Sequence, residues 1–264
     1  MNAIEISEIL MLFGGGLLAG TLGGLLGIGG GIVLMPMLRF LVGLSPAHAA
    51  GTCILAVFFT TLGGSYRHYK QGNVNLRSLV PIMISGAVAT VIFSFVFLYL
   101  STRDRWLDLG MGLVFALVSI RMIAEGIPGL VKKRVSEKTD NEMKGTLVQK
   151  ISIGSLAGAL PGLLGIGTGV ILVPAFTYIL SAPIKAAMAS SLTCFSVNAL
   201  ISSGFKYAQG FIELNVALPI CLGTLIGATV GARLNNRFSS GALRLAFGLV
   251  FSYVSLKFIL SFTR

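Results

Sequence analysis

The chain has 264 residues, of which 55% are hydrophobic and only 11% charged, and its formal net charge is +11. Soluble proteins carry about a quarter of their residues as charged side chains, so too little charge is present to cover a water-facing surface. The basic residues gather in short polar gaps between apolar segments, which is typical of cytoplasmic topology signals and argues against a nucleic-acid-binding surface. We therefore expect a multi-pass membrane protein with the lipid bilayer, and not nucleic acid, as its surroundings.

Hydrophobic segments follow one another along both halves of the chain. In the first half they are expected at 9–26, 28–42, 47–66, 79–100 and 106–127. In the second half they are expected at 151–164, 168–180, 186–205, 215–232 and 243–262. A helix needs about 20 apolar residues to span hydrocarbon, and the segments at 28–42, 151–164 and 168–180 have only about 14. Residues 1–8 contain no Lys or Arg, so the first segment is expected to be a retained part of the fold and not a secretory signal.

An internal repeat relates the two halves. Residues 24–36 read GLLGIGGGIVLMP and residues 162–174 read GLLGIGTGVILVP, an offset of 138 (162 minus 24). Near the end of the chain the offset becomes 136, where Gly112 matches Gly248. Such internal symmetry is typical of transporter folds. We expect a first membrane repeat at 1–128, a charged cytoplasmic linker at 129–149 and a second membrane repeat at 150–264.

The number of segments in each repeat bears on its orientation. Five is odd, so the second repeat should be inverted relative to the first, with both termini outside. If the linker is cytoplasmic, the gaps at 67–78, 181–186 and 233–244 lie on the same side and collect most of the basic residues, as the positive-inside rule requires. The alternative is a parallel arrangement in which one segment of each half does not cross. The predicted fold is an all-α integral membrane protein of two inverted repeats, with short broken helices at the glycine-rich motifs.

The glycine clusters at 27–31 and 165–169 are the first candidates for a binding site. They lack the glycine spacing of a dinucleotide loop and the Lys-Ser or Lys-Thr of a P-loop. Each glycine in a helix interior costs about 1 kcal/mol relative to Ala, so the clusters predict breaks whose unpaired N–H groups suit an anion. Close packing, as expected for the glycine ladders that precede each break, is the alternative. The candidate residues are Gly29, Gly30, Gly31, Gly167, Thr168 and Gly169.

Small polar residues occupy equivalent places soon after each break. Thr52 and Cys53 match Ser190 and Ser191 at the offset of 138, and Asn198 lies further along the second copy. Their hydroxyl and amide groups could ligate an oxyanion without adding fixed charge, although a hydroxyl in a membrane helix often bonds its own backbone instead.

Ionisable residues limit the kinds of substrate. All nine acidic residues fall in loops or at segment ends, whereas cation carriers usually hold carboxylates within the membrane. The predicted substrate is thus an anion or a neutral molecule. Arg121 and Lys257 are expected to reach the interface, Arg39 is a weak site candidate, and His48 and His68 are candidates for proton coupling. No metal or cofactor is expected, because the three cysteines have neither zinc nor disulfide spacing.

The doubled motif resembles that of the TauE/SafE family of sulfite exporters and anion permeases. The family pattern is Gly-Leu-Leu-Gly-Ile-Gly-Gly-Gly followed by Pro and then an Ala-x-Gly-Thr-Ser-Leu element. It matches residues 24–36 with 49–54, and residues 162–174 with 187–192, with Cys53, Thr168 and Ala189 as departures. The resemblance implies transport of sulfite, sulfonates or other sulfur-containing anions in a bacterial inner membrane.

Together the residues and the resemblance predict a secondary transporter, an exporter of a small sulfur-containing anion that works by alternating access. A homodimer is a further expectation. Two alternatives remain: an anion channel of the same fold, and a membrane sulfur-transfer protein that uses Cys53 or Cys194. The second lacks a paired acid and base beside the thiols, so the protein is not expected to be an enzyme.

Overall fold

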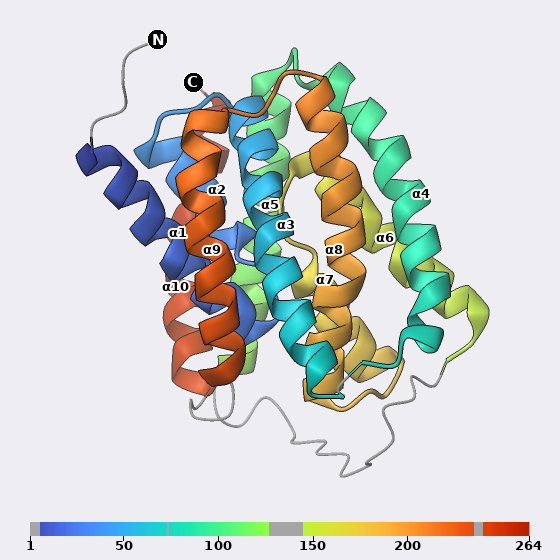
Figure 1. Cartoon of the computed structure of the whole chain (residues 1–264). Coiled ribbons are helices and arrows are strands. Elements are labelled where there is room, and N and C mark those ends of the chain that lie inside the picture. Colours follow the sequence, from blue (N-terminus) through green and yellow to red (C-terminus); the bar gives the residue numbers. More distant parts are fainter. Residues whose placement is uncertain (1–5, 73, 127–144, 235–239, 264) are drawn as a thin grey trace.

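The computed structural model describes residues 6–72, 74–126, 145–234 and 240–263, and within these ranges it is helical without strands (Figure 1). The helices of the first half are α1 (Ile6–Leu26), α2 (Gly31–Pro36), the π-helix η1 (Met37–Leu41), α3 (Pro46–Lys70), α4 (Leu76–Leu100) and α5 (Asp104–Gly126). Those of the second half are α6 (Leu147–Leu164), α7 (Gly169–Pro174), the π-helix η2 (Ala175–Ile179), α8 (Ile184–Ala208), α9 (Leu214–Leu234) and α10 (Ser240–Thr263). Seven of these helices are long and apolar enough to cross a membrane, which confirms the prediction of an all-α membrane protein.

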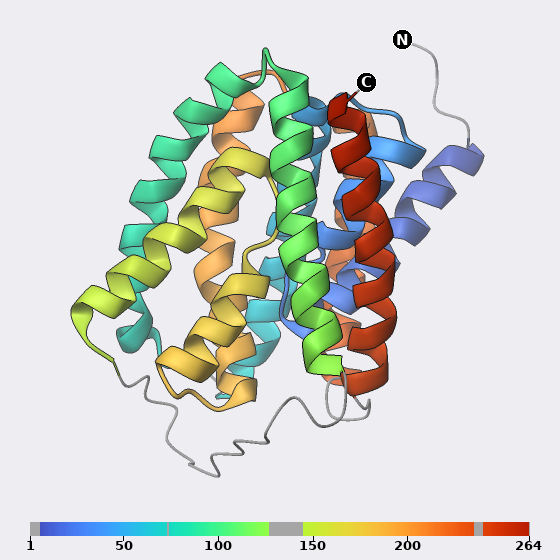
Figure 2. The same cartoon turned by 180° about the vertical axis from the view of Figure 1, so that it is seen from behind.

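Each half begins with a hairpin that enters the bundle and turns back. In Figure 1, α1 descends from the upper side and α2 returns toward it, whereas α6 rises from the lower side and α7 returns downward. The crossing helices then alternate in direction, so that α3 descends and α8 ascends (Figures 1 and 2). The two hairpins therefore enter from opposite sides of the bundle, whereas the inverted repeat itself stays a prediction.

Glycines spaced by four precede each break and form two glycine ladders, Gly16, Gly20 and Gly24 in α1 and Gly154, Gly158 and Gly162 in α6. These ladders let helices of the two halves pack closely against each other. A Cβ added to Gly20 would lie 2.6 Å from Thr224 Cα on α9, and one added to Gly158 would lie 2.9 Å from Gly86 Cα on α4. These contacts are equivalent, because Thr224 and Gly86 differ by 138 in number (224 minus 86). Real Cβ atoms essentially never approach this closely, so only glycine permits the contact. Each hairpin thus packs on the third long helix of the opposite half, α1 on α9 and α6 on α4.

A second pair of equivalent contacts joins α5 to α10. The hydroxyl of Ser119 donates to Gly248 O at 2.8 Å, and the hydroxyl of Ser255 donates to Gly112 O at 2.9 Å. Both partners of one bond map onto the other at an offset of 136 (255 minus 119, and 248 minus 112). Because polar side chains in apolar surroundings need partners, these reciprocal bonds set the register of the two antiparallel helices.

Two local features differ from the sequence-based expectation. Helix α6 starts at Leu147, inside the predicted linker, and has 18 residues, because Thr146 and Gln149 form a capping box at its start. Its length of about 27 Å is close to a full crossing. The returning arms widen from α- to π-helix directly after Pro36 and Pro174, since proline supplies no N–H for the regular ladder.

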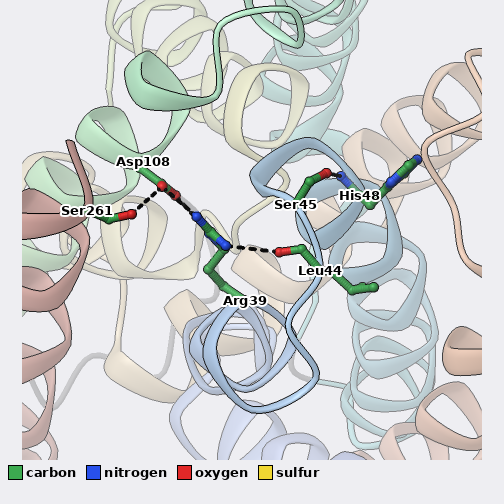
Figure 3. A network of polar contacts seen from close by, with 6 residues as sticks. All are labelled: Arg39, Leu44, Ser45, His48, Asp108 and Ser261. Carbon is green, nitrogen blue, oxygen red and sulfur yellow. Dashed lines mark hydrogen bonds and ion pairs between the residues drawn. The ribbon is translucent and has the colours of Figure 1, made fainter. Parts of the chain in front are cut away.

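An ion pair fixes the returning arm of the first hairpin to its neighbours (Figure 3). Arg39 on η1 makes two bonds to the Asp108 carboxylate, at 3.1 Å from Nε and 2.9 Å from Nη2, and its Nη1 donates to Leu44 O. Ser261 on α10 donates to the same carboxylate at 2.9 Å. Asp108 lies one turn inside α5 and is only 2% exposed, so it is a buried carboxylate, but a fully paired one. Arg39, the weak site candidate, is occupied by this clamp.

Replacing a glycine of the ladders by alanine should destabilise the fold. Gly20→Ala would place a methyl group against the backbone of α9 and is expected to cost about 1–3 kcal/mol. The measurement is thermal unfolding in detergent. Gly14→Ala in the same helix is the matched control, because nothing lies within 4 Å of its added Cβ. That variant should be neutral or gain up to about 1 kcal/mol of helix propensity. Equal stability of the two variants would contradict the packing described.

Neutralising Asp108 should leave the Arg39 guanidinium without its carboxylate. Asp108→Asn is expected to lower stability by about 3 kcal/mol, because breaking a largely buried pair leaves an uncompensated charge. Glu213→Gln is the control: its carboxylate is exposed and lies 3.9 Å from the His48 ring, so its loss should cost about 0.5 kcal/mol or less. Similar unfolding temperatures for both variants would show that the clamp contributes nothing.

Candidate functional site

The two helix breaks adopt different backbone conformations. In the first break Gly27, Gly29 and Gly30 have φ values of 72°, 81° and 73°, a region that side chains with a Cβ rarely enter. In the second break only Gly165 has a positive φ, at 67°, and Thr168 is right-handed with φ of −91°. The right-handed backbone explains why threonine can stand at the place of Gly30.

Backbone donors are left open at both breaks. Among the described residues, no group accepts a hydrogen bond from the N–H of Gly29, Gly30 or Gly31. The same holds, within the described ranges, for Gly167, Thr168 and Gly169. Helices α2 and α7 have only six residues each, so these bare N–H groups, more than any helix dipole, give the breaks their positive character.

The breaks lie against each other in the middle of the bundle. A Cβ added to Gly31 would be 2.8 Å from Gly167 N, and one added to Gly169 would collide with Gly27 O. The fully buried Phe195 ring of α8 packs on both breaks, at 2.7 Å from a Cβ added to Gly29 and 3.4 Å from one added to Gly167. The predicted glycines are thus brought together into one region, which Phe195 covers in this conformation.

Two of the small polar residues reach the first break. Cys53 Sγ lies 3.6 Å from Gly31 O, and the hydroxyl of Ser191 donates to Gly27 O at 3.3 Å. They are equivalent positions of the repeat (191 minus 53 is 138), and both side chains are buried. They come from α3 and α8, so one central helix of each half contributes to the region around the breaks.

Two further candidates carry buried polar atoms without a partner. Thr168 Oγ1 and Asn198 Oδ1 make no hydrogen bond within the described part of the chain, although both residues are at most 1% exposed. Asn198 lies beside Gly86 of α4, whose added Cβ would be 2.9 Å from its Nδ2. Buried polar groups are nearly always paired in native proteins, so these atoms indicate a place for a ligand or water.

The remaining two candidates are Thr52 and Ser190. Thr52 has a partner away from the breaks, and no bond among the described residues joins Ser190 to a break. Thr52 Oγ1 accepts a hydrogen bond from Glu213 N at 3.1 Å and so ties α3 to the start of α9. Ser190 is 2% exposed and neighbours Ser191 on α8. Thr52 therefore has a structural partner, which the hydroxyl's position in the sequence could not disclose.

Sequence reasoning did not single out Lys206. Its side chain is fully buried in α8, and its ammonium contacts the end of α6 directly before the second break. The signal that could have found it is the alignment of the repeats, which places Lys206 opposite His68 (206 minus 138) inside the two central helices. His68 is also buried, at 3% exposure.

Comparison with known proteins agrees with this architecture. The family model of the sulfite exporter TauE/SafE matches residues 12–258. A probable membrane transporter protein of Methanocaldococcus jannaschii is 27% identical over 261 residues, which cover 93% of each chain. A probable membrane transporter protein of Xylella fastidiosa strain 9a5c is 28% identical and covers 96% of this chain and 95% of its own.

A plant relative matches over a shorter region. The sulfite exporter TauE/SafE family protein 1 of Arabidopsis thaliana is 31% identical over 115 residues, 42% of this chain and 25% of its own length. No solved structure matches the chain. Because the family model spans nearly all of the described bundle, and the archaeal and Xylella transporter proteins match 93% and 96% of the chain, the chain belongs to the TauE/SafE family of membrane transporters.

Proposed function

We propose that this protein is a secondary transporter that exports a small sulfur-containing anion, such as sulfite or an organosulfonate, by alternating access. The observation that supports it most is the meeting of two helix breaks with open N–H donors beside the unpartnered Thr168 hydroxyl. The proposed location is the inner membrane, with the linker on the cytoplasmic side. A homodimer remains a prediction.

The chemistry of the region favours an oxyanion. Backbone N–H and hydroxyl groups both donate hydrogen bonds, and sulfite and sulfonate groups present several acceptor oxygens within one small tetrahedral or pyramidal group. Bonds to a charged partner are worth about 1.5–3 kcal/mol each, which is enough to replace some of an anion's hydration. Asp108, a carboxylate buried in the described part of the bundle, is paired with Arg39. Its negative charge is therefore balanced and would not repel an anionic substrate.

Export of an anion needs no coupled cation. Moving one negative charge out of an inside-negative cell is favourable by about 2.3 kcal/mol per 100 mV. The same field opposes uptake, which would require a driving ion and a site for it. Export is therefore the direction that we propose.

The two hairpins and the Phe195 ring that covers the breaks support the proposal of alternating access. The hairpins enter from opposite sides and meet at the breaks, and Phe195 packs on both of them. A substrate reaching the donors must displace this ring and separate a hairpin from its neighbours. A channel of the same fold would instead keep the breaks open to both sides at once, and its fluxes would not saturate at carrier-like rates.

The test is sulfite efflux from proteoliposomes. Thr168→Val keeps the shape of the side chain but removes the hydroxyl, and we expect the KM for sulfite to rise about 10-fold or more, as loss of one bond to a charged group predicts. Saturation at ordinary turnover would favour a carrier over a channel.

Thr177→Val is the matched control for this substitution. The Thr177 hydroxyl donates to Val173 O within the same returning arm, at 2.8 Å, and faces no break. Its loss should change the KM by no more than about 2-fold. Wild-type KM values in both variants would remove Thr168 from the site, and the absence of any saturable anion flux in the wild type would refute the proposed function itself.

A further inference from the structure

Lys206 carries a buried charge that no carboxylate balances within the described residues. Its side chain is 0% exposed, and its ammonium donates to Pro161 O at 3.1 Å, Gly162 O at 2.8 Å and Ser202 Oγ at 3.2 Å. The Phe97 ring lies below it, 4.1 Å from Nζ to the ring centroid. Ionisable side chains inside a membrane bundle are costly and usually serve a transport pathway.

The Lys206 ammonium lies at the end of α6, next to the second break. Pro161 and Gly162 belong to the last turn of α6, which ends at the second break. The carboxyl end of a helix carries about half a negative charge, so the full positive charge of Lys206 exceeds it and leaves the region positive. The first break lies directly against the second, because a Cβ added to Gly31 would be 2.8 Å from Gly167 N, so it is close to the same charge.

A purely structural role would be to cap the carbonyls of α6. The first half tests this explanation, because His68 occupies the equivalent position on α3. Neither ring nitrogen of His68 has a hydrogen-bond partner in the described part of the chain, yet α1 ends and the first break forms all the same. Formation of a break therefore does not require a cation at this position, and the burial of a charge in the second half needs another cause.

We propose that Lys206 determines the charge selectivity of the transport site: the positive charge of its ammonium favours an anion over a neutral solute of the same shape at the two breaks. The inference rests on the proposed function and adds to it the residue that selects for charge. Lys206 acts through its electric field and not by direct contact, since its three N–H groups are used by two carbonyls and a hydroxyl. It is a specificity-determining residue beside the donors and not one of them.

The experiment compares a charged and a neutral inhibitor of nearly equal shape. Methanesulfonate and dimethyl sulfone are tested as competitors of sulfite efflux from proteoliposomes. In the wild type, methanesulfonate should inhibit at least about 10-fold more strongly than the sulfone, a ratio that corresponds to about 1.4 kcal/mol. In Lys206→Gln the ratio should fall to about 3-fold or less, because the amide keeps donors for the carbonyls of α6 but carries no charge.

Two further variants separate charge from capping. Lys206→Arg keeps the charge and should keep the inhibitor ratio within about 3-fold of the wild type. Lys257→Met is the control for removing a lysine from a membrane helix: this exposed side chain lies over the Phe40 ring, 4.3 Å from Nζ to its centroid, and its loss should leave the ratio unchanged.

The outcomes distinguish the inference from the proposed function. A wild-type ratio preserved in Lys206→Gln, with only a lower unfolding temperature, would reduce Lys206 to a helix cap and overturn the inference. Equal inhibition by both compounds in the wild type would overturn it even if no neutral variant folds. In either case saturable sulfite efflux would still support the proposed function, whereas a wild type that moves no anion would refute that function directly.

Discussion

A helix that stops inside a bilayer exposes backbone groups that neither water nor lipid can satisfy, and most of this architecture answers that constraint. Irregular backbone at membrane depth is tolerated only where protein surrounds it or where it lines a cavity. Here both breaks lie in the middle of the bundle, packed against each other and against α3 and α8. Gly27 meets Met188 and Gly165 meets Ala50, which are equivalent positions on the two central helices (188 minus 50 is 138). The burial of the breaks is thus built into the repeat.

Among the described residues, carbonyl groups at the two breaks have hydrogen-bond partners, whereas the N–H groups do not. At the second break the Lys206 ammonium donates to a carbonyl in the last turn of α6. At the first break Ser191 donates to Gly27 O, and the Cys53 thiol contacts Gly31 O. The N–H groups on the other side of each break find no hydrogen-bond acceptor in the described chain. Open N–H donors of this kind suit a negative ligand.

Much of this arrangement could be predicted from the sequence, and the remainder depends on contacts between distant segments. Hydropathy predicted the long helices, because each span must be apolar over its own length. The spacing of the glycines predicted both the ladders and the breaks, since the cost of glycine in a helix is local. The pairing of Arg39 with Asp108 could not be predicted, because it joins residues 69 positions apart and makes a buried carboxylate acceptable. The bond that Glu213 N donates to Thr52 and the contacts of Lys206 could not be predicted for the same reason: the partners lie far along the chain.

Differences between the halves matter as much as their likeness. If the two halves were identical, the outward- and inward-facing forms of an inverted repeat would have equal free energy, and every departure from symmetry shifts that balance. Arg39 and Asp108 correspond in number to Thr177 and Arg244, two residue types that cannot form the same ion pair, so within the described residues this pair occurs in the first half. Gly30 and His68 correspond to Thr168 and Lys206, so a hydroxyl and a buried cation are added in the second half alone. Among the described residues, the first hairpin is therefore the one tied by an ion pair to α5, whereas the Thr168 hydroxyl and the Lys206 ammonium lie at the second break. If the protein works by alternating access, as proposed, these differences between the halves would give its two forms unequal free energies.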